Sequence, residues 1–166
     1  MMFGLAALIP LVLLGAVAGL DVVSFPQAMI SRPIAAATLA GALMGHPARG
    51  LIAGAMLELF ALEVLPVGAA RYPDHGPGAV GAVLAVVLIG RHQLWLGVAL
   101  GLVLATVGSW SLRWLRRANS RAVAGSSAAL QALVPGILGR LHWAAFRRDL
   151  ARSIALTALA IGAGWA

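Results

Sequence analysis

Apolar residues run in long blocks along this chain, and short polar or proline-rich stretches separate the blocks. Residues 3–20 form an uncharged run of about the length that a helix needs to cross a bilayer. The runs at 33–45 and 50–65 are shorter, and further runs follow at 79–90 and 94–112. Continuous blocks of this kind predict α-helices rather than half-buried strands. We therefore expect an all-α, polytopic helical membrane protein whose short segments are broken or re-entrant helices.

The composition supports a membrane protein. The 166 residues are 61% hydrophobic and 10% charged, with a mean hydropathy of +0.96, whereas a soluble domain carries about 25% charged residues. The net charge is +7, and all 12 basic side chains are arginine. These arginines flank the apolar runs, which favours a role in bilayer orientation, so we expect no nucleic-acid partner. The chain lacks cysteine and shows no metal-ligand or cofactor motif, so we expect no metal, no cofactor and no catalytic residue.

The first apolar run has two interpretations. The letters AVA before Gly19 look like the cleavage site of a signal peptide. However, no Lys or Arg precedes the run, and the chain after it is also membrane-like. We therefore expect residues 3–20 to be retained as a helix, which Pro10 should bend.

Ionisable side chains interrupt the apolar sequence between residues 31 and 78. Glu58 lies in the middle of the 50–65 run, where an unpaired carboxylate in lipid costs at least about 2.5 kcal/mol. It needs a cationic partner, a proton or water, and both a structural ion pair and a functional role are open. The available cations are Arg32, Arg49 and Arg71.

Two proline-containing stretches flank the short runs. Residues 21–32 bring an Asp, a Gln and an Arg close together, and they form either an ordinary interfacial loop or an unwound segment that lines a cavity. Residues 66–78 are predicted to be a turn-rich loop with Asp74 next to His75. Both stretches are candidates for the functional centre.

The C-terminal half contains two arginine clusters. The first follows the 94–112 run and its tryptophans, which is typical of the cytoplasmic side of a membrane helix. The second lies near one face of a predicted amphipathic helix. The clusters are Arg113, Arg116, Arg117 and Arg121, and then Arg140, Arg147, Arg148 and Arg152. We divide the chain into a membrane permease core at 1–122, a cytoplasmic-side interfacial amphipathic segment at 123–152 and a C-terminal apolar helix at 153–166.

Several short motifs follow one another in a characteristic order. They are LD at 20–21, Gln27, SRP at 31–33, a small-residue run closing at Gly45, then Gly50 and Gly54 before LE at 57–58, and PVGAA…PD across 66–74. Over roughly residues 5–117 this order resembles the membrane subunit IIC of the mannose/fructose/sorbose family of the bacterial sugar phosphotransferase system. The chain departs from the family in having His46 where an acidic residue is common, and in being shorter.

The resemblance implies a function and a set of partners. IIC subunits pair with a membrane subunit, IID, to form the sugar path. Cytoplasmic IIA and IIB phosphocarriers pass on phosphate from phosphoenolpyruvate, and the phosphohistidine of IIB phosphorylates the entering sugar. We therefore expect an oligomeric, multi-pass permease subunit for a hexose-type sugar in the bacterial cytoplasmic (inner) membrane. Phosphoryl transfer itself would belong to IIB, so whether this chain counts as an enzyme is open.

The resemblance also implies a substrate site. The matching positions are Gln27, Arg32, Glu58, Gly68, Ala69 and Asp74. Carboxylates and amides exchange hydrogen bonds with hydroxyl groups, and glycine backbone admits a sugar ring. Our hypothesis is that Glu58, Gln27 and Asp74 converge on sugar hydroxyls while Arg32 pairs with an acidic neighbour.

Two other classes of function stay open. The chain could be a non-transporting scaffold or interaction subunit derived from the same family, which its short length favours. Independently of that alternative, the length fits a short variant, a truncated gene product or a subunit that relies on a partner for the remaining helices. A membrane enzyme that uses Asp74 and His75, or His142 with a serine, has less support because no nucleophile–base spacing is evident.

Overall fold

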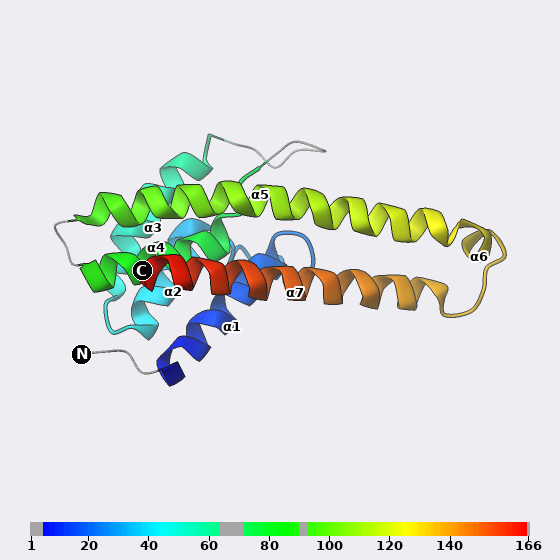
Figure 1. The fold of residues 1–166 in the computed structure, drawn as a ribbon, viewed down its shortest axis with the longest axis horizontal. Coiled ribbons are helices and arrows are strands. Elements are labelled where there is room, and N and C mark those ends of the chain that lie inside the picture. The colour runs from blue at the N-terminus through cyan, green and yellow to red at the C-terminus, as the bar shows by residue number, and fades with distance from the viewer. Residues whose placement is uncertain (1–4, 64–71, 90–92, 166) are drawn as a thin grey trace.

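The computed structural model describes residues 5–63, 72–89 and 93–165, and this part of the chain contains helices and no strand. The helices are α1 (Leu5–Asp21), α2 (Pro33–Leu43), α3 (Pro47–Ala61), α4 (His75–Ile89), α5 (Leu94–Gly125), α6 (Ser127–Gln131) and α7 (Ile137–Trp165). Helices α5 and α7 run side by side along the molecule and are joined through α6, while α1 to α4 pack around one end of this pair (Figure 1). The all-α prediction is confirmed.

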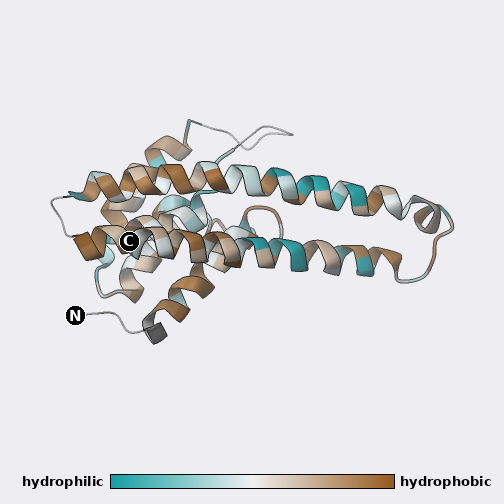
Figure 2. Cartoon of the chain, in the orientation of Figure 1, coloured by the Kyte–Doolittle hydropathy of each residue, from teal (hydrophilic) through white to brown (hydrophobic). Residues whose placement is uncertain are grey.

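Helix length separates α5 from the other apolar helices. Among the described residues, α5 alone is long and apolar enough to cross a membrane by itself. Helices α2 and α3 have 11 and 15 residues, fewer than the roughly 20 that a spanning helix needs. The short runs therefore form short helices, as expected. In Figure 2 the ribbons of α5 and α7 are coloured mostly hydrophobic where they lie beside the other helices, and more hydrophilic along much of the part that extends beyond them.

Helices α2 and α3 form a hairpin that depends on small residues. Each begins with a proline, which fixes the backbone and needs no hydrogen bond in the first turn. Gly45 in the turn between them has a φ of +74°, a value that glycine adopts without strain. A Cβ on Gly50 would lie 2.2 Å from the carbonyl oxygen of Ala37. The two backbones can approach this closely only because α3 has no side chain at this point.

Helix α4 is the centre of the body. Its residues 75–86 are all buried, and the helix packs against α1, α2, α3, α5 and α7. A helix that is apolar on all sides suits such a position, because no face has to meet water. The core side chains of α4 include Val80, Val83 and Leu84, each fully buried.

The structure corrects the expected loop at 66–78. Helix α4 already begins at His75, so residues 75–78 are helical. Pro77 fits there because the first turn of a helix has no carbonyl acceptor for its N–H groups. Residues 64–71, which include Gly68, Ala69 and Arg71, lie outside the described residues.

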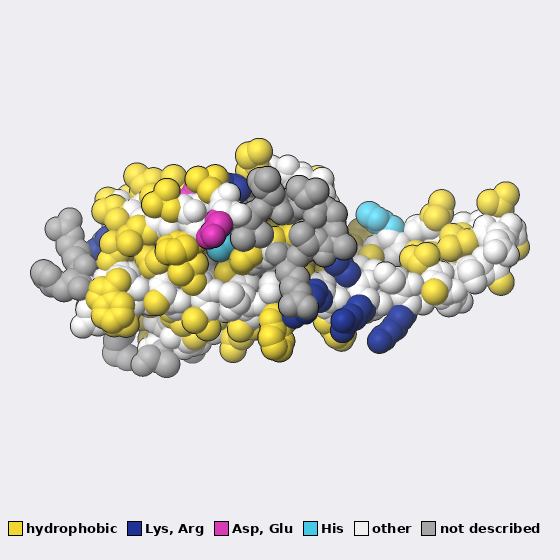
Figure 3. Space-filling model, turned by 90° about the horizontal axis from the view of Figure 1, so that it is seen from above, with side chains coloured by type: hydrophobic (Ala, Val, Ile, Leu, Met, Phe, Trp, Pro, Cys, Tyr) yellow, Lys and Arg dark blue, Asp and Glu magenta, His cyan; other side chains and the backbone are white. Residues whose placement is uncertain are grey.

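Helix α7 runs through residue 152, where we expected one segment to end and another to begin. The part of the predicted 123–152 segment from Ile137 onward and the predicted C-terminal apolar helix thus form one 29-residue helix. Together with the end of α5 it makes a hairpin that projects from the body, and several arginine side chains gather on one face where it emerges (Figure 3).

Replacement of Gly50 by alanine should destabilise the fold, because the added Cβ must push α3 away from α2. Overpacking of this kind costs about 1–3 kcal/mol. Gly139→Ala in α7 is the matched control, because a Cβ there meets nothing within 4 Å and should leave stability unchanged or slightly raised. Thermal unfolding in detergent measures both variants. Equal melting temperatures for Gly50→Ala and the unmodified chain would contradict the close packing.

Candidate functional site

A polar cavity of about 280 Å³ lies where the loop between α1 and α2 meets the end of α3 and the beginning of α4. Its size is close to the lower end of the range for small-molecule pockets, about 300 Å³. Both polar and apolar side chains line it. The lining residues are Asp21, Val22, Gln27, Met29, Ser31, Arg32, Pro33, Ala61, Tyr72, Pro73 and His75.

The last residue of α1, Asp21, organises the loop that forms one wall. Its carboxylate accepts hydrogen bonds from the N–H groups of Ala28 (2.6 Å) and Ser31 (2.9 Å) and from the Ser31 hydroxyl (2.8 Å). Within this loop Gln27 and Met29 have φ values of +56° and +61°. Residues other than glycine rarely adopt such a backbone conformation. The carboxylate therefore offsets the cost of a backbone that presents Gln27 to the cavity.

An ion pair forms a second part of this wall. The Arg32 guanidinium contacts a carboxylate oxygen of Glu58, and the other oxygen accepts the N–H of Ile34 at 3.2 Å. Ile34 lies in the first turn of α2, where N–H groups lack partners within the helix and negative charge is favoured. Arg32 is thus the cation that compensates the carboxylate of Glu58. Arg49 instead donates to the carbonyl of Val87 at 3.3 Å.

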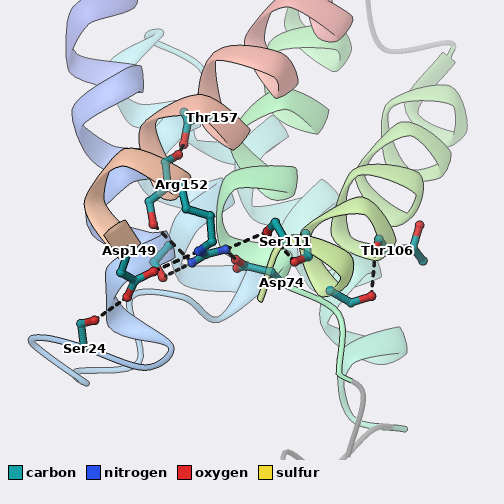
Figure 4. A network of polar contacts seen from close by, with 11 residues as sticks. Ser24, Asp74, Thr106, Ser111, Asp149, Arg152 and Thr157 are labelled. Carbon is teal, nitrogen blue, oxygen red and sulfur yellow. Dashed lines mark hydrogen bonds and ion pairs between the residues drawn. The ribbon is translucent and has the colours of Figure 1, made fainter. Parts of the chain in front are cut away.

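A second polar cluster, the Arg152 network, is buried (Figure 4). Arg152 of α7 donates through Nη1 to Asp74 Oδ2 at 2.6 Å and through Nε to Asp149 Oδ1 at 2.9 Å. Its other N–H groups reach Ser111 Oγ, the Gly19 carbonyl and Ser153 Oγ at 3.2, 2.9 and 3.3 Å. All five guanidinium donors are therefore used.

The Arg152 network ties distant parts of the chain together. Asp149 also accepts a hydrogen bond from Ser24 in the loop after α1, and the Asp74 N–H donates to the carbonyl of Ala105 in α5 at 3.0 Å. A Cβ at position 108 would lie 2.6 Å from that of Asp74, so the glycine in α5 makes room for this carboxylate. One cluster thus connects α1, α5, α7 and the beginning of α4.

The prediction that Arg152 lies on an exposed arginine face is wrong. Its side chain is 3% exposed, and those of Asp74 and Asp149 are 0% and 1% exposed. Spacing along the helix suggested a common face with Arg148, but the carboxylates of Asp74 and Asp149 compensate the charge and make burial possible.

The predicted site residues divide into three groups. Gln27 and Arg32 line the polar cavity, and Glu58 lies next to it through its ion pair with Arg32. Asp74 does not line the cavity, because its carboxylate faces Arg152. Gly68 and Ala69 lie outside the described residues.

Sequence reasoning missed several residues of the site. The lining residues that were not predicted as substrate contacts include Asp21, Ser31, Tyr72 and His75. Asp21 lies in the LD motif and Ser31 in the SRP motif. The motifs therefore pointed to this region, although neither residue was predicted to contact the substrate. Among the described residues, no three His, Asp or Glu side chains gather as metal ligands would.

Comparison with known proteins identifies the class of this helical, cavity-containing fold. The family model described as "PTS system sorbose-specific iic component" matches residues 5–164, which is nearly the whole chain. The chain therefore belongs to the family of sorbose-type IIC components of the phosphotransferase system.

Individual relatives match over shorter segments. The sorbose-specific EIIC component of Lacticaseibacillus casei is 34% identical over 77 residues, 46% of this chain and 27% of that protein. The mannose-specific EIIC component of Escherichia coli K12 is 35% identical over 79 residues, 46% of this chain and 29% of that protein. The fructose permease IIC component of Bacillus subtilis is 32% identical over 103 residues, 61% and 37% of the two chains. In each case the match covers less than two fifths of the relative.

A solved structure shares the fold. A chain in the cryo-EM structure of the mannose transporter ManYZ with microcin E492 aligns with a TM-score of 0.81 at 22% identity. The alignment covers 99% of this chain and 66% of the other. The helical arrangement, with its short helices, is thus that of a known membrane transporter chain.

Replacement of Arg152 by methionine should strongly destabilise the chain. Methionine keeps the apolar stem and leaves the carboxylates of Asp74 and Asp149 buried without their cation, which costs about 3–5 kcal/mol. Arg147→Met, at an exposed position of the same helix, is the control and should change stability little. Unfolding in detergent measures the difference.

Removal of one of the two carboxylates that Arg152→Met leaves unpaired should restore part of the lost stability. The double variant Arg152→Met with Asp74→Leu is expected to unfold at a higher temperature than Arg152→Met alone, because fewer buried charges lack a partner. A single Arg152→Met variant as stable as Arg147→Met would contradict the role of the network.

Proposed function

We propose that this chain is the membrane IIC component of a phosphoenolpyruvate-dependent sugar phosphotransferase system, and that its polar cavity is part of the path of a hexose-type sugar. The observation that carries the proposal is the lining of this cavity. It combines the Gln27 amide, the Arg32 guanidinium and the Tyr72 phenol with apolar surface from Met29 and two prolines.

Such a lining suits a sugar. Each hydroxyl group of a hexose donates and accepts hydrogen bonds, so a binding site needs several polar groups of both kinds at fixed positions. The carbon–hydrogen faces of the ring need apolar contacts between those polar groups. Glu58 supports the site by holding Arg32 in place. The substrate-contact roles of Asp74, Gly68 and Ala69 stay predictions.

The remaining steps follow the family pattern. We propose a multi-pass chain in the bacterial inner membrane that works with a IID subunit and assembles into an oligomer. Phosphorylation of the entering sugar by IIB, supplied through IIA, completes the cycle. The solved chain of similar fold belongs to the mannose transporter ManYZ, and this likeness supports the idea of a second membrane subunit.

Sugar binding by the chain together with a IID-like partner tests this proposal. We expect co-purification of the two proteins and binding of mannose, fructose or sorbose by isothermal titration calorimetry. Gln27→Ala and Arg32→Gln should each weaken binding, by roughly threefold and tenfold or more, because they remove a neutral and a charged hydrogen-bonding group. Glu58→Gln should also weaken it through loss of the ion pair.

Glu63→Gln is the matched control for Glu58→Gln, because Glu63 is exposed and does not line the cavity. It should leave binding unchanged. Co-purification without binding of any of the three hexoses would contradict the sugar-path proposal. That result would favour the alternative, a non-transporting scaffold subunit derived from the family.

A further inference from the structure

His75 is a polar side chain of the cavity wall with no assigned role. It is the first residue of α4, it lines the polar cavity, and it is 9% exposed. Neither Nδ1 nor Nε2 has a hydrogen-bond partner among the described residues. A neutral imidazole carries one donor and one acceptor, and buried groups of this kind are nearly always satisfied in folded proteins.

The backbone on both sides holds His75 in position. The residue before it, Asp74, is fixed by Arg152 and by the Ala105 carbonyl. The residue after it, Gly76, lies so close to α1 that a Cβ would be 2.9 Å from that of Ala18. The imidazole is therefore carried on a rigid support, which lowers the entropy cost of any hydrogen bond that it makes to a ligand.

The polar side chains of the cavity come from two parts of the chain. Gln27 and Arg32 approach the cavity from the loop between α1 and α2, whereas His75 approaches from α4. The charge of Arg32 is compensated by Glu58, and both oxygens of the Asp21 carboxylate already accept hydrogen bonds within the loop. The cavity therefore offers a ligand mainly the neutral groups of Gln27, Tyr72 and His75, which fits a small uncharged polyol.

We propose that His75 is a specificity-determining residue, whose imidazole forms a hydrogen bond with one hydroxyl group of the sugar in the polar cavity. The proposal rests on the proposed function of that cavity. The residue contacts the ligand from the beginning of α4 and thereby selects sugars that carry a hydroxyl group at the matching position.

Deoxy sugars test the proposal by calorimetry on the full chain with its IID-like partner. The probe is whichever of mannose, fructose and sorbose binds tightest, together with its monodeoxy analogues. For the unmodified protein we expect one analogue to lose about tenfold or more in affinity because the imidazole loses its partner. His75→Leu should weaken the parent sugar by about the same factor and bind that analogue as well as the parent.

Two further variants separate a specific contact from general damage. His75→Gln keeps a donor and an acceptor and should retain much of the discrimination, and it also serves if the leucine variant does not fold. His142→Leu replaces an exposed histidine outside the cavity and should leave affinity and discrimination unchanged.

The outcomes distinguish the two proposals. If the unmodified protein binds a hexose and His75→Leu shows the same deoxy profile, or loses affinity equally for every analogue, the role of His75 is overturned while the sugar site stands. If the unmodified protein with its partner binds none of the hexoses, the proposed function fails, and the role of His75 fails with it.

Discussion

The buried guanidinium of Arg152 is the interaction on which the arrangement of the helices depends. It joins α7 to the end of α1, to α5 and to the segment before α4 through three hydrogen bonds, and two more go to Asp149 and Ser153 within α7. Inside an apolar body such a charge is tolerable only when every donor is used and a carboxylate lies in contact. Asp74 and Asp149 meet this condition, so α7 cannot slide or rotate without stranding charges away from water.

Small residues and short helices determine where the polar cavity lies. The α2–α3 hairpin packs so closely at Gly50 that its helices contact each other through backbone. The first-turn N–H groups of α2 have no acceptor within the helix. The Glu58 carboxylate accepts the N–H of Ile34 and at the same time holds Arg32. The ion pair thus satisfies the beginning of α2, and it places Arg32 beside the cavity.

Local pattern predicted the helices and drew attention to some of the polar residues in and next to the cavity. Apolar blocks indicated the short helices, and isolated polar residues such as Gln27, Arg32 and Glu58 marked the cavity because lipid tolerates them only near partners or water. Long-range pairing was out of reach. Arg152 and Asp74 lie 78 positions apart, and helical spacing placed Arg152 with exposed arginines. Likewise the glycines and prolines around His75 indicated a loop, although tertiary packing makes them the first turn of a buried helix.

Asp74 and His75 are consecutive residues with different surroundings. The carboxylate of the first is anchored by α7, and the side chain of the second forms part of the wall around the cavity. A single peptide unit therefore separates the structural anchor of the body from the surface that meets a ligand. Since that unit is planar and stiff, the first turn of α4 cannot tilt toward a ligand without also straining the ion pair between Asp74 and Arg152. The shape of the polar cavity is therefore coupled to the packing position of α7.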